Sequence, residues 1–179
     1  MNLPREINPK LSYFIGYLQG DGAIESNKKR IDFIDEYSDQ IKQINTLSLE
    51  LFNVKGKVIK TRGIKSKKYA HRLDIGSIVL NSYINKVFGV NRGIKSNLKI
   101  PEIMRSNKEI FKWYLRGLFD ADGTLPKNPD KCKQYFIDIT MKDRNFINEI
   151  KEALGSFGIE TLKPYCRIAK SPNSEYISQ

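Results

Sequence analysis

The first 90 residues alternate between segments in which apolar residues recur every three or four positions and segments in which they recur every second position. The first spacing is typical of helices and the second of half-buried strands. We therefore expect the order helix, two strands, helix, two strands, helix. The expected elements are a helix that contains Phe14 and Leu18, a hairpin with its turn at residues 27–29 and its second strand at 30–35, a helix from Ser38 as N-cap to Asn53, strands at residues 54–62 and 69–77, and a helix at residues 78–88 that ends at Gly89.

The same order of elements begins again after residue 108. Residues 91–108 contain Gly93, Pro101 and mixed charges, which is typical of a linker, so we expect a first repeat at residues 1–90 and a second at 109–179. The expected elements of the second repeat are a helix at residues 113–122, a loop at 126–133, a strand at 134–140, a helix capped by Asp143, and strands at 160–168 and 175–178. A counterpart of the helix at 78–88 is missing after Gln179. Because its absence would expose an apolar face, we expect the sequence to lack its natural C-terminus rather than the repeat to lack a helix.

Two of the expected helices end in an aspartate and a glycine, at Asp21-Gly22 and Asp122-Gly123. Each is preceded by small residues four positions apart, namely Gly16 and Gly20, and Gly117 and Ala121. Such spacing lets two helix backbones approach closely, and parallel packing would bring Asp21 and Asp122 together. Two carboxylates at the negative ends of two helices are costly unless a cation lies between them. One Asp-Gly alone is equally consistent with an ordinary helix stop, but two copies in a basic chain favour a divalent metal site.

The balance of charge indicates the class of partner. The 179 residues include 31 Lys and Arg against 20 Asp and Glu, a net charge of +11, which favours nucleic acid, although a ribosomal or membrane-surface protein would share it. No apolar run approaches the roughly 20 residues of a membrane helix, and the first ten residues contain no signal-peptide core. We expect a non-secreted protein of a prokaryotic cytoplasm or an organelle matrix. Cys132 and Cys166 are isolated, which predicts neither a zinc site nor a disulfide.

The residues around both aspartates resemble the motif of the LAGLIDADG homing endonucleases of the two-motif, intron-encoded type. Residues 115–123 differ from that motif mainly at Arg116 and Phe119, whereas residues 14–22 are looser and have Gln19 in place of its earlier acidic residue. Lys95-Ser96 and residues 100–103 are similar to the segment that precedes the second motif in the family. The resemblance implies an α+β fold in which two pseudo-symmetric αββαββα repeats form a saddle of antiparallel sheets around the two motif helices.

The resemblance also implies a function, that of a metal-dependent endonuclease that cuts both strands of DNA and leaves a staggered break. The implied ligands of two or more Mg²⁺ ions are Asp21 and Asp122, with the backbone carbonyls of Gly20 and Ala121. Lys142 matches a lysine that the family often places after the second strand, near the scissile phosphate, but an ordinary surface lysine would also fit there. The first half has an acidic segment, residues 35–37, at the corresponding place. Unequal cleavage rates on the two strands are therefore expected.

Strand faces and loop tips supply the candidate DNA contacts. Side chains that alternate onto one strand face would meet base edges, and basic turns would meet phosphates. The candidate strand residues are Arg30, Asp32, Lys60, Arg62, Arg72 and Asp74 in the first repeat and Gln134, Asp138, Thr140, Lys163 and Arg167 in the second. The candidate tip residues are Lys28, Lys29, Lys127 and Lys131, together with residues 65–68. Because both halves lie in one chain, we expect a monomer, and because the halves differ at these positions, we expect it to bind a long asymmetric duplex.

Two other functions are compatible with this resemblance. One is an intron RNA maturase, and the other is a DNA-binding regulator derived from an inactive endonuclease. The presence of both Asp21 and Asp122 argues against a purely non-catalytic protein but leaves a combined maturase and endonuclease open. An intein origin is not expected, because the sequence begins at Met1 without flanking splicing segments. His71 lies in an expected strand, which favours a structural or DNA-facing role over that of a general base.

Overall fold

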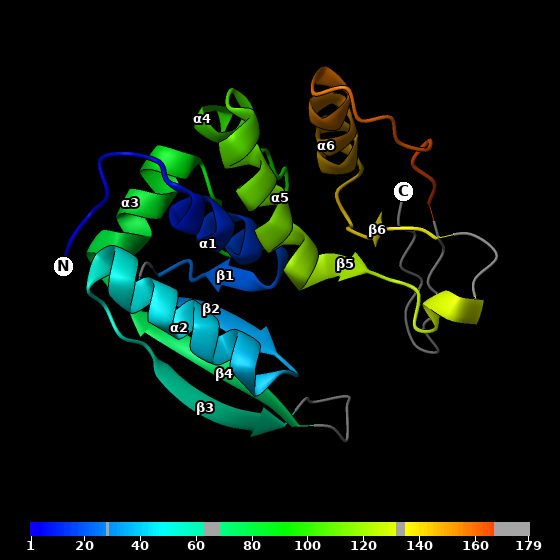
Figure 1. The fold of residues 1–179 in the computed structure, drawn as a ribbon. Helices are drawn as coiled ribbons and strands as arrows, with labels where there is room; N and C mark the ends of the chain where they lie inside the picture. The colour runs from blue at the N-terminus through cyan, green and yellow to red at the C-terminus, as the bar shows by residue number, and fades with distance from the viewer. Residues whose placement is uncertain (28, 63–68, 132–134, 167–179) are drawn as a thin grey trace.

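A computed structural model of the chain describes residues 1–27, 29–62, 69–131 and 135–166, and its first half has the expected order of elements (Figure 1). These elements are α1 (Pro9–Gly20), β1 (Gly22–Ile24), β2 (Arg30–Asp35), α2 (Ser38–Phe52), β3 (Lys57–Arg62), β4 (Tyr69–Gly76) and α3 (Ile78–Phe88). The four strands form one antiparallel sheet in the order β1-β2-β4-β3. Helix α2 lies along β2 and β4, and α1 lies between the sheet and the second half of the chain (Figure 1).

Two boundaries in the first half differ from the prediction. Helix α2 begins at Ser38, so its N-cap is Tyr37, and Ser38 as the N-cap is wrong. The hydroxyl of Ser38 instead faces the neighbouring carboxylate of Asp39 at 3.4 Å. Strand β3 begins three residues later than expected, because residues 54–56 are bonded to α2. There, the hydroxyl of Ser48 donates to the carbonyl of Val54, and the amide of Gly56 donates to the side chain of Asn45.

The second repeat is seen only in part. Its described elements are α5 (Lys108–Asp122), β5 (Gly123–Thr124), the 3₁₀ turn η1 (Pro129–Lys131), β6 (Asp138–Ile139) and α6 (Arg144–Ser156), preceded by the short helix α4 (Glu102–Arg105). The expected strand at residues 134–140 is reduced to β6, which pairs with β5. Residues 160–166 form no strand, so that part of the prediction is wrong, and residues 167–168 and 175–178 lie outside the described residues. Leu162 and Tyr165 are 91% and 65% exposed, and alternation without a pairing strand does not make a stable strand.

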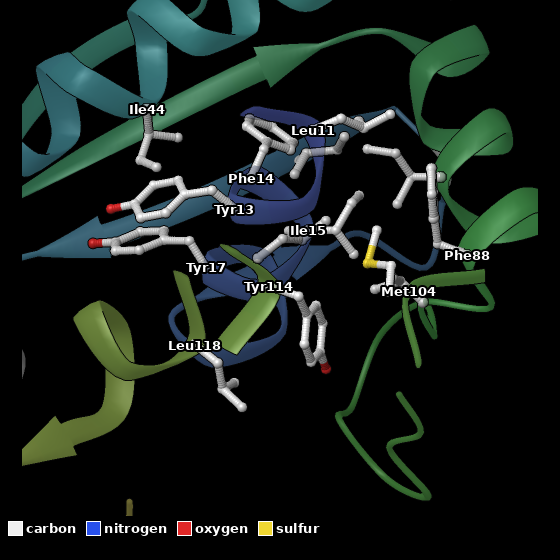
Figure 2. Close-up of a cluster of buried hydrophobic side chains, with 14 of the residues drawn as sticks. Leu11, Tyr13, Phe14, Ile15, Tyr17, Ile44, Phe88, Met104, Tyr114 and Leu118 are labelled. Carbon is white, nitrogen blue, oxygen red and sulfur yellow. The ribbon is translucent and has the colours of Figure 1, made fainter. Parts of the chain in front are cut away.

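Helix α1 is the centre of the hydrophobic core. All of its residues from Leu11 to Gly20 are buried, because α1 contacts the sheet and α2 on one side and α5 on the other. Phe14 packs edge-on against Phe33 of β2 and Phe52 of α2. Figure 2 shows the stacked rings of Tyr13 and Tyr17 on another side of the helix, away from Tyr114 and Met104. A helix that is apolar on every side has to be enclosed in this way.

Helices α1 and α5 pack in parallel with their backbones in contact. A Cβ atom placed on Gly16 would lie 2.0 Å from the carbonyl oxygen of Tyr114, and one placed on Gly117 would lie 2.1 Å from the carbonyl oxygen of Tyr13. Distances this short leave no room for a methyl group at either position. The small residues therefore permit the close approach that their spacing predicts, and they fix the relative position of the two helix ends.

Gly117→Ala is expected to destabilise the protein by about 3 kcal/mol or more, because the new methyl group would meet main-chain atoms that cannot rotate away. Gly155→Ala in α6 is a matched control, since nothing lies within 4 Å of its Cβ position. There the substitution is expected to stabilise the helix by about 0.5–1 kcal/mol. Urea unfolding of both variants tests the prediction, which would be contradicted if Gly117→Ala unfolded at the same urea concentration as the wild type.

Candidate metal centre

The two motif aspartates meet at the same end of the α1–α5 pair. Asp21 follows the last residue of α1 as its C-cap, and Asp122 is the last residue of α5. The Oδ2 atom of Asp122 lies 3.3 Å from the position that a Cβ of Gly20 would occupy, and the methyl group of Ala121 lies over the same point at 2.3 Å. Both carboxylates are therefore positioned by the contact between the helix backbones. The carboxylate pair thus forms where the sequence predicts it, at the ends of two packed helices.

Both carboxylates bind protons more tightly than an ordinary aspartate does. Burial raises the pKa of Asp21 to about 7, and the nearby charges of Asp122 and Asp35 act in the same direction. Burial also raises the pKa of Asp122. For both groups the positive charge of Lys95 opposes the shift. Carboxylates that lie half-buried near each other in this way gain from a cation placed between them.

Lys95 is a member of this site that the sequence did not reveal. Its ammonium donates to the carbonyl oxygen of Gln19 at 3.0 Å and to that of Gly20, one of the carbonyls expected to bind metal. Burial lowers the pKa of Lys95, against the opposing effect of Asp122 and Asp21, although the residue as a whole is exposed. The resemblance marked Lys95 only as part of a family-like segment. Its neighbours have no helical or strand spacing, so only the three-dimensional path of residues 91–98 places it here.

Buried polar side chains surround the carboxylate pair, and their contacts explain why an amide, Gln19, stands where the motif has an acidic residue. The amide of Gln19 donates to the carbonyl of Lys99 at 2.9 Å, and its oxygen accepts from the hydroxyl of Tyr114. Gln19 is only 2% exposed, and its amide forms hydrogen bonds through both its donor and its acceptor. An ionised carboxylate at this buried position could accept from Tyr114 but could not donate to the carbonyl of Lys99. On the other side, the hydroxyl of Tyr17 donates to Asp35 at 2.5 Å. This bond holds the Asp35 carboxylate, whose charge acts on Asp21, at the end of β2.

The donor set fits a magnesium ion. Asp21, Asp122 and the carbonyl of Gly20 offer only oxygen atoms, which Mg²⁺ prefers, and Mg²⁺ commonly keeps several waters and uses few protein ligands. Within the described residues, no three or more His, Cys, Asp or Glu side chains form a common metal site. Any metal held here would therefore depend on these two carboxylates, backbone oxygens, water and substrate.

Four candidate DNA contacts of the first repeat share one face of the sheet. Arg30 and Asp32 of β2 and Arg72 and Asp74 of β4 alternate with buried core residues, so they lie on the face away from α2. In the register of β3 with β4, Lys60 pairs with His71 and Arg62 with Tyr69, which places both basic residues on the opposite face. There they lie over the ring of Tyr69, 4.3 and 5.9 Å from its centroid. The strand β3 instead contributes Lys57, Ile59 and Thr61 to the face with Arg72, which sequence reasoning missed because it left the register undetermined.

The remaining candidates lie at turns and in the second repeat. Asp138 lies in β6 opposite Thr124, and Thr140 follows this strand. Lys142 lies in the exposed turn between β6 and α6, where Asp143 caps α6 as predicted. The other exposed candidates are Lys29 in the first hairpin, Lys127 and Lys131 in the loop after β5, and Lys163 in the segment after α6. Lys28, residues 65–68, Gln134 and Arg167 lie outside the described residues.

Each half of the chain matches a known protein family. Residues 10–78 match the WhiA LAGLIDADG-like domain, and residues 109–175 match a LAGLIDADG-like domain. The chain is a LAGLIDADG protein. The two matches cover the two segments that end in Asp21 and Asp122, so the resemblance inferred from the motifs is confirmed. No helix in the described part of this LAGLIDADG protein is both long and apolar enough to cross a membrane.

Much longer proteins contain a related segment. The LAGLIDADG chain is 32% identical over 171 residues to glutamine–fructose-6-phosphate aminotransferase of Methanocaldococcus jannaschii, covering 95% of the chain but 14% of that protein. It is also 30% identical over 184 aligned positions to the small subunit of replication factor C from the same organism, covering 89% of the chain and 9% of that protein. The chain thus spans only a small part of each of these two proteins, whose names describe different activities.

Solved structures share the fold of this LAGLIDADG chain. The homing endonuclease I-DmoI in complex with DNA and manganese has a TM-score of 0.57 at 18% identity, over 87% of this chain and 81% of I-DmoI. The N-terminal LAGLIDADG domain of DUF199/WhiA has a TM-score of 0.61 at 16% identity, over 89% of this chain and 70% of that domain. At these identities the likeness establishes a common fold.

In the absence of metal, Asp21→Asn is expected to stabilise this LAGLIDADG protein at pH 8 by an amount on the order of 1 kcal/mol, and much less at pH 5. The pKa of Asp21 rises from an ordinary 3.8 to about 7 on folding, so the folded state holds a proton that the unfolded state has lost. The wild type therefore loses stability as the pH rises from about 4 to 7, and asparagine removes that loss. Thermal unfolding in EDTA at both pH values tests this, and an equal effect of the substitution at pH 5 and pH 8 would contradict it.

Proposed function

We propose that this LAGLIDADG protein is a site-specific endonuclease that hydrolyses both strands of DNA with Mg²⁺ and leaves a staggered break at a long asymmetric target. The observation that carries the proposal is the meeting of Asp21 and Asp122 at the parallel ends of α1 and α5. A net charge of +11 supports a polyanionic substrate. Structures of I-DmoI, which shares the fold, contain its target DNA together with manganese or magnesium.

The site residues divide into metal ligands and cations. Asp21, Asp122 and the carbonyls of Gly20 and Ala121 would hold the metal ions, which when bound activate the attacking water and neutralise the leaving oxygen. Lys95 places its ammonium beside both carboxylates, where it can also stabilise negative charge on the phosphate. Lys142 is the corresponding proposed cation of the second repeat. Because Lys95 and Lys142 lie in different surroundings, the two strands are proposed to be cut at different rates.

The sheet of the first repeat is the proposed binding surface for one half of the target. Its face away from α2 carries charged side chains within reach of base edges, and the hairpin turn with the exposed Lys29 lies at its end. The complete saddle of the family would add a second sheet for the other half of the target. With both repeats in one chain, we propose that a monomer binds one duplex and that the two half-sites differ in sequence.

The experiment that tests the proposal is cleavage of a random duplex library by the purified protein in Mg²⁺ or in EDTA. Sequencing of the cut ends is expected to recover one long motif with unequal halves and staggered ends, in Mg²⁺ only. Sedimentation of the protein on the recovered duplex is expected to show one protein molecule per site. Absence of cutting in Mg²⁺, or equal cutting in EDTA, would overturn the nuclease assignment.

A second candidate function is DNA binding without cleavage. The specific observation in its favour is that the ammonium of Lys95 already bonds to the carbonyl of Gly20 and offsets the charge of both aspartates. An internal cation of this kind can stabilise the carboxylate pair without metal. A protein that selects one duplex sequence from the library but cuts it in neither Mg²⁺ nor Mn²⁺ would have this function.

A further inference from the structure

Two aspartates and two arginines form a ring of charges on the sheet face away from α2, and Glu25 also pairs with Arg30. Asp32 of β2 and Asp74 of β4 lie directly opposite each other in the register. Arg72 lies on one side of this pair, and its Nε donates to Asp74 at 2.5 Å while its Nη2 donates to Asp32 at 3.2 Å. Arg30 lies on the other side, with its Nε 3.0 Å from Asp32 and its Nη1 3.7 Å from Asp74. Each aspartate therefore contacts both arginines.

This ring is a poor device for stabilising the sheet. Two carboxylates directly opposite each other on neighbouring strands repel, and ion pairs with exposed partners contribute little to stability. The side chains of Arg30 and Arg72 are 40% and 28% exposed, so both side chains reach solvent, although the Nε atom of Arg30 is buried. What the ring does achieve is orientation, because two carboxylates at two different nitrogens fix the plane of the Arg72 guanidinium.

The free edge of Arg72 matches the edge of one base. Its bonds to Asp74 and Asp32 use Nε and one side of Nη2, and no bond among the described residues uses Nη1. Two parallel N–H groups, one from Nη1 and one from Nη2, therefore point away from the ring. In the major groove, guanine presents O6 and N7 as two neighbouring acceptors, and a bidentate arginine is the side chain that pairs with them best. Thymine and cytosine offer no such pair of acceptors.

We propose that Arg72 is a specificity-determining residue that binds a guanine in the half-site of the first repeat, and that Asp32 and Asp74 are its positioning residues. The inference rests on the proposed function only in that this sheet face binds duplex DNA, and it does not require cleavage. The aspartates have a second effect, because their negative charge opposes the binding of every duplex and only a sequence that pairs with Arg72 compensates for it. Removing one of them should therefore strengthen non-specific binding and also weaken the preference for one base at one position. Loss of a merely structural ion pair would leave that base preference unchanged.

The test is selection of bound duplexes from a random library in EDTA, so that cleavage plays no part. The proteins are the wild type, Arg72→Lys, Asp74→Asn and the control Lys60→Ala, whose lysine lies on the opposite face of the sheet. The wild type is expected to prefer guanine at one position, and Arg72→Lys to lower that preference roughly tenfold with the other positions unchanged. Asp74→Asn is expected to lower the same preference and to bind an unrelated duplex more tightly. Lys60→Ala is expected to keep the wild-type preference.

Each outcome of this selection has a meaning. If Arg72→Lys binds all sequences more weakly by the same factor, or selects guanine as the wild type does, the inference is overturned while the proposed function stands. If the wild type retains no duplex, DNA binding itself fails, and the proposed function falls with the inference. Melting temperatures close to that of the wild type will show that the variants are folded, and Arg72→Lys keeps the positive charge that balances the two aspartates.

Discussion

Asp122→Asn and Asp21→Asn are each expected to reduce DNA cleavage by at least about a hundredfold while DNA binding stays nearly unchanged. Asparagine keeps the shape of aspartate and one oxygen, but it removes the negative charge that holds a divalent cation between the helix ends. Asp21 lies at the end of α1 and Asp122 at the end of α5, so one carboxylate cannot move to the place of the other when that one is lost. Cleavage rates with saturating Mg²⁺, together with gel-shift affinities in EDTA, measure the two effects separately.

Asp120→Asn provides the control for these two variants. Asp120 belongs to the same motif, but it pairs with Arg116 on its own helix and accepts a hydrogen bond from Tyr13. The Asp120 carboxylate takes part in the contact between α1 and α5 and is not one of the two proposed metal ligands. Asp120→Asn should therefore keep cleaving DNA. Full activity of Asp122→Asn, or an equal loss in Asp120→Asn, would show that the carboxylate pair is not the catalytic centre.

Lys95→Met is expected to lower the rate of cleavage by roughly 10²–10³-fold and to strengthen Mg²⁺ binding. The rate should fall because methionine fills the space of the lysine stem but carries no charge to stabilise the phosphate. Metal binding should strengthen because the carbonyl of Gly20 loses its hydrogen bond from the ammonium, and because a positive charge leaves the neighbourhood of both aspartates. Single-turnover cleavage and a Mg²⁺ titration of the rate measure the two effects, which have opposite signs.

The matched control for Lys95 is Lys99→Met. Lys99 lies four residues further along the same segment, and only its backbone carbonyl takes part in the site, through Gln19. Its side chain is exposed, so the variant is expected to cut and bind metal like the wild type. If Lys95→Met cut DNA at the rate of Lys99→Met, Lys95 would serve only to balance charge in the metal-free protein.

The pair of aspartates could be predicted because every feature that forms it is local. Apolar spacing defines the helices, glycines four positions apart define their contact face, and Asp-Gly marks their ends. Lys95 could not be predicted in the same way. Its position depends on residues 91–98 crossing the end of α1, where the amide of Gly93 donates to the carbonyl of Ile24 and the amide of Leu98 to Asp143. These bonds join residues far apart in sequence, so no spacing within the segment encodes them.

The face on which a strand residue lies could be predicted only where buried neighbours in the same strand fix the orientation of that strand. Ile31 and Phe33 are buried, which fixes the direction of Arg30 and Asp32, and Leu73 does the same for Arg72. Strand β3 lies at the edge of the sheet and has no fully buried residue, so no residue in it shows which side of the strand faces the core. A shift of one residue in such a strand exchanges its two faces, which is why Lys60 and Arg62 could not be placed without the register.

The backbone contact of α1 with α5 also limits how the two halves of this protein can be exchanged with those of others. Main-chain atoms meet at Gly16 and Gly117, so the separation of the main chains that carry the two aspartates is set by the helices themselves. A chimera that joins this first half to a foreign second half would keep the separation only if the incoming helix has small residues where Gly117 and Ala121 stand. A larger residue at either position would separate the aspartates even if both halves folded correctly. New combinations of half-sites are therefore best built by transferring strands and turns while α1 and α5 stay together as one unit.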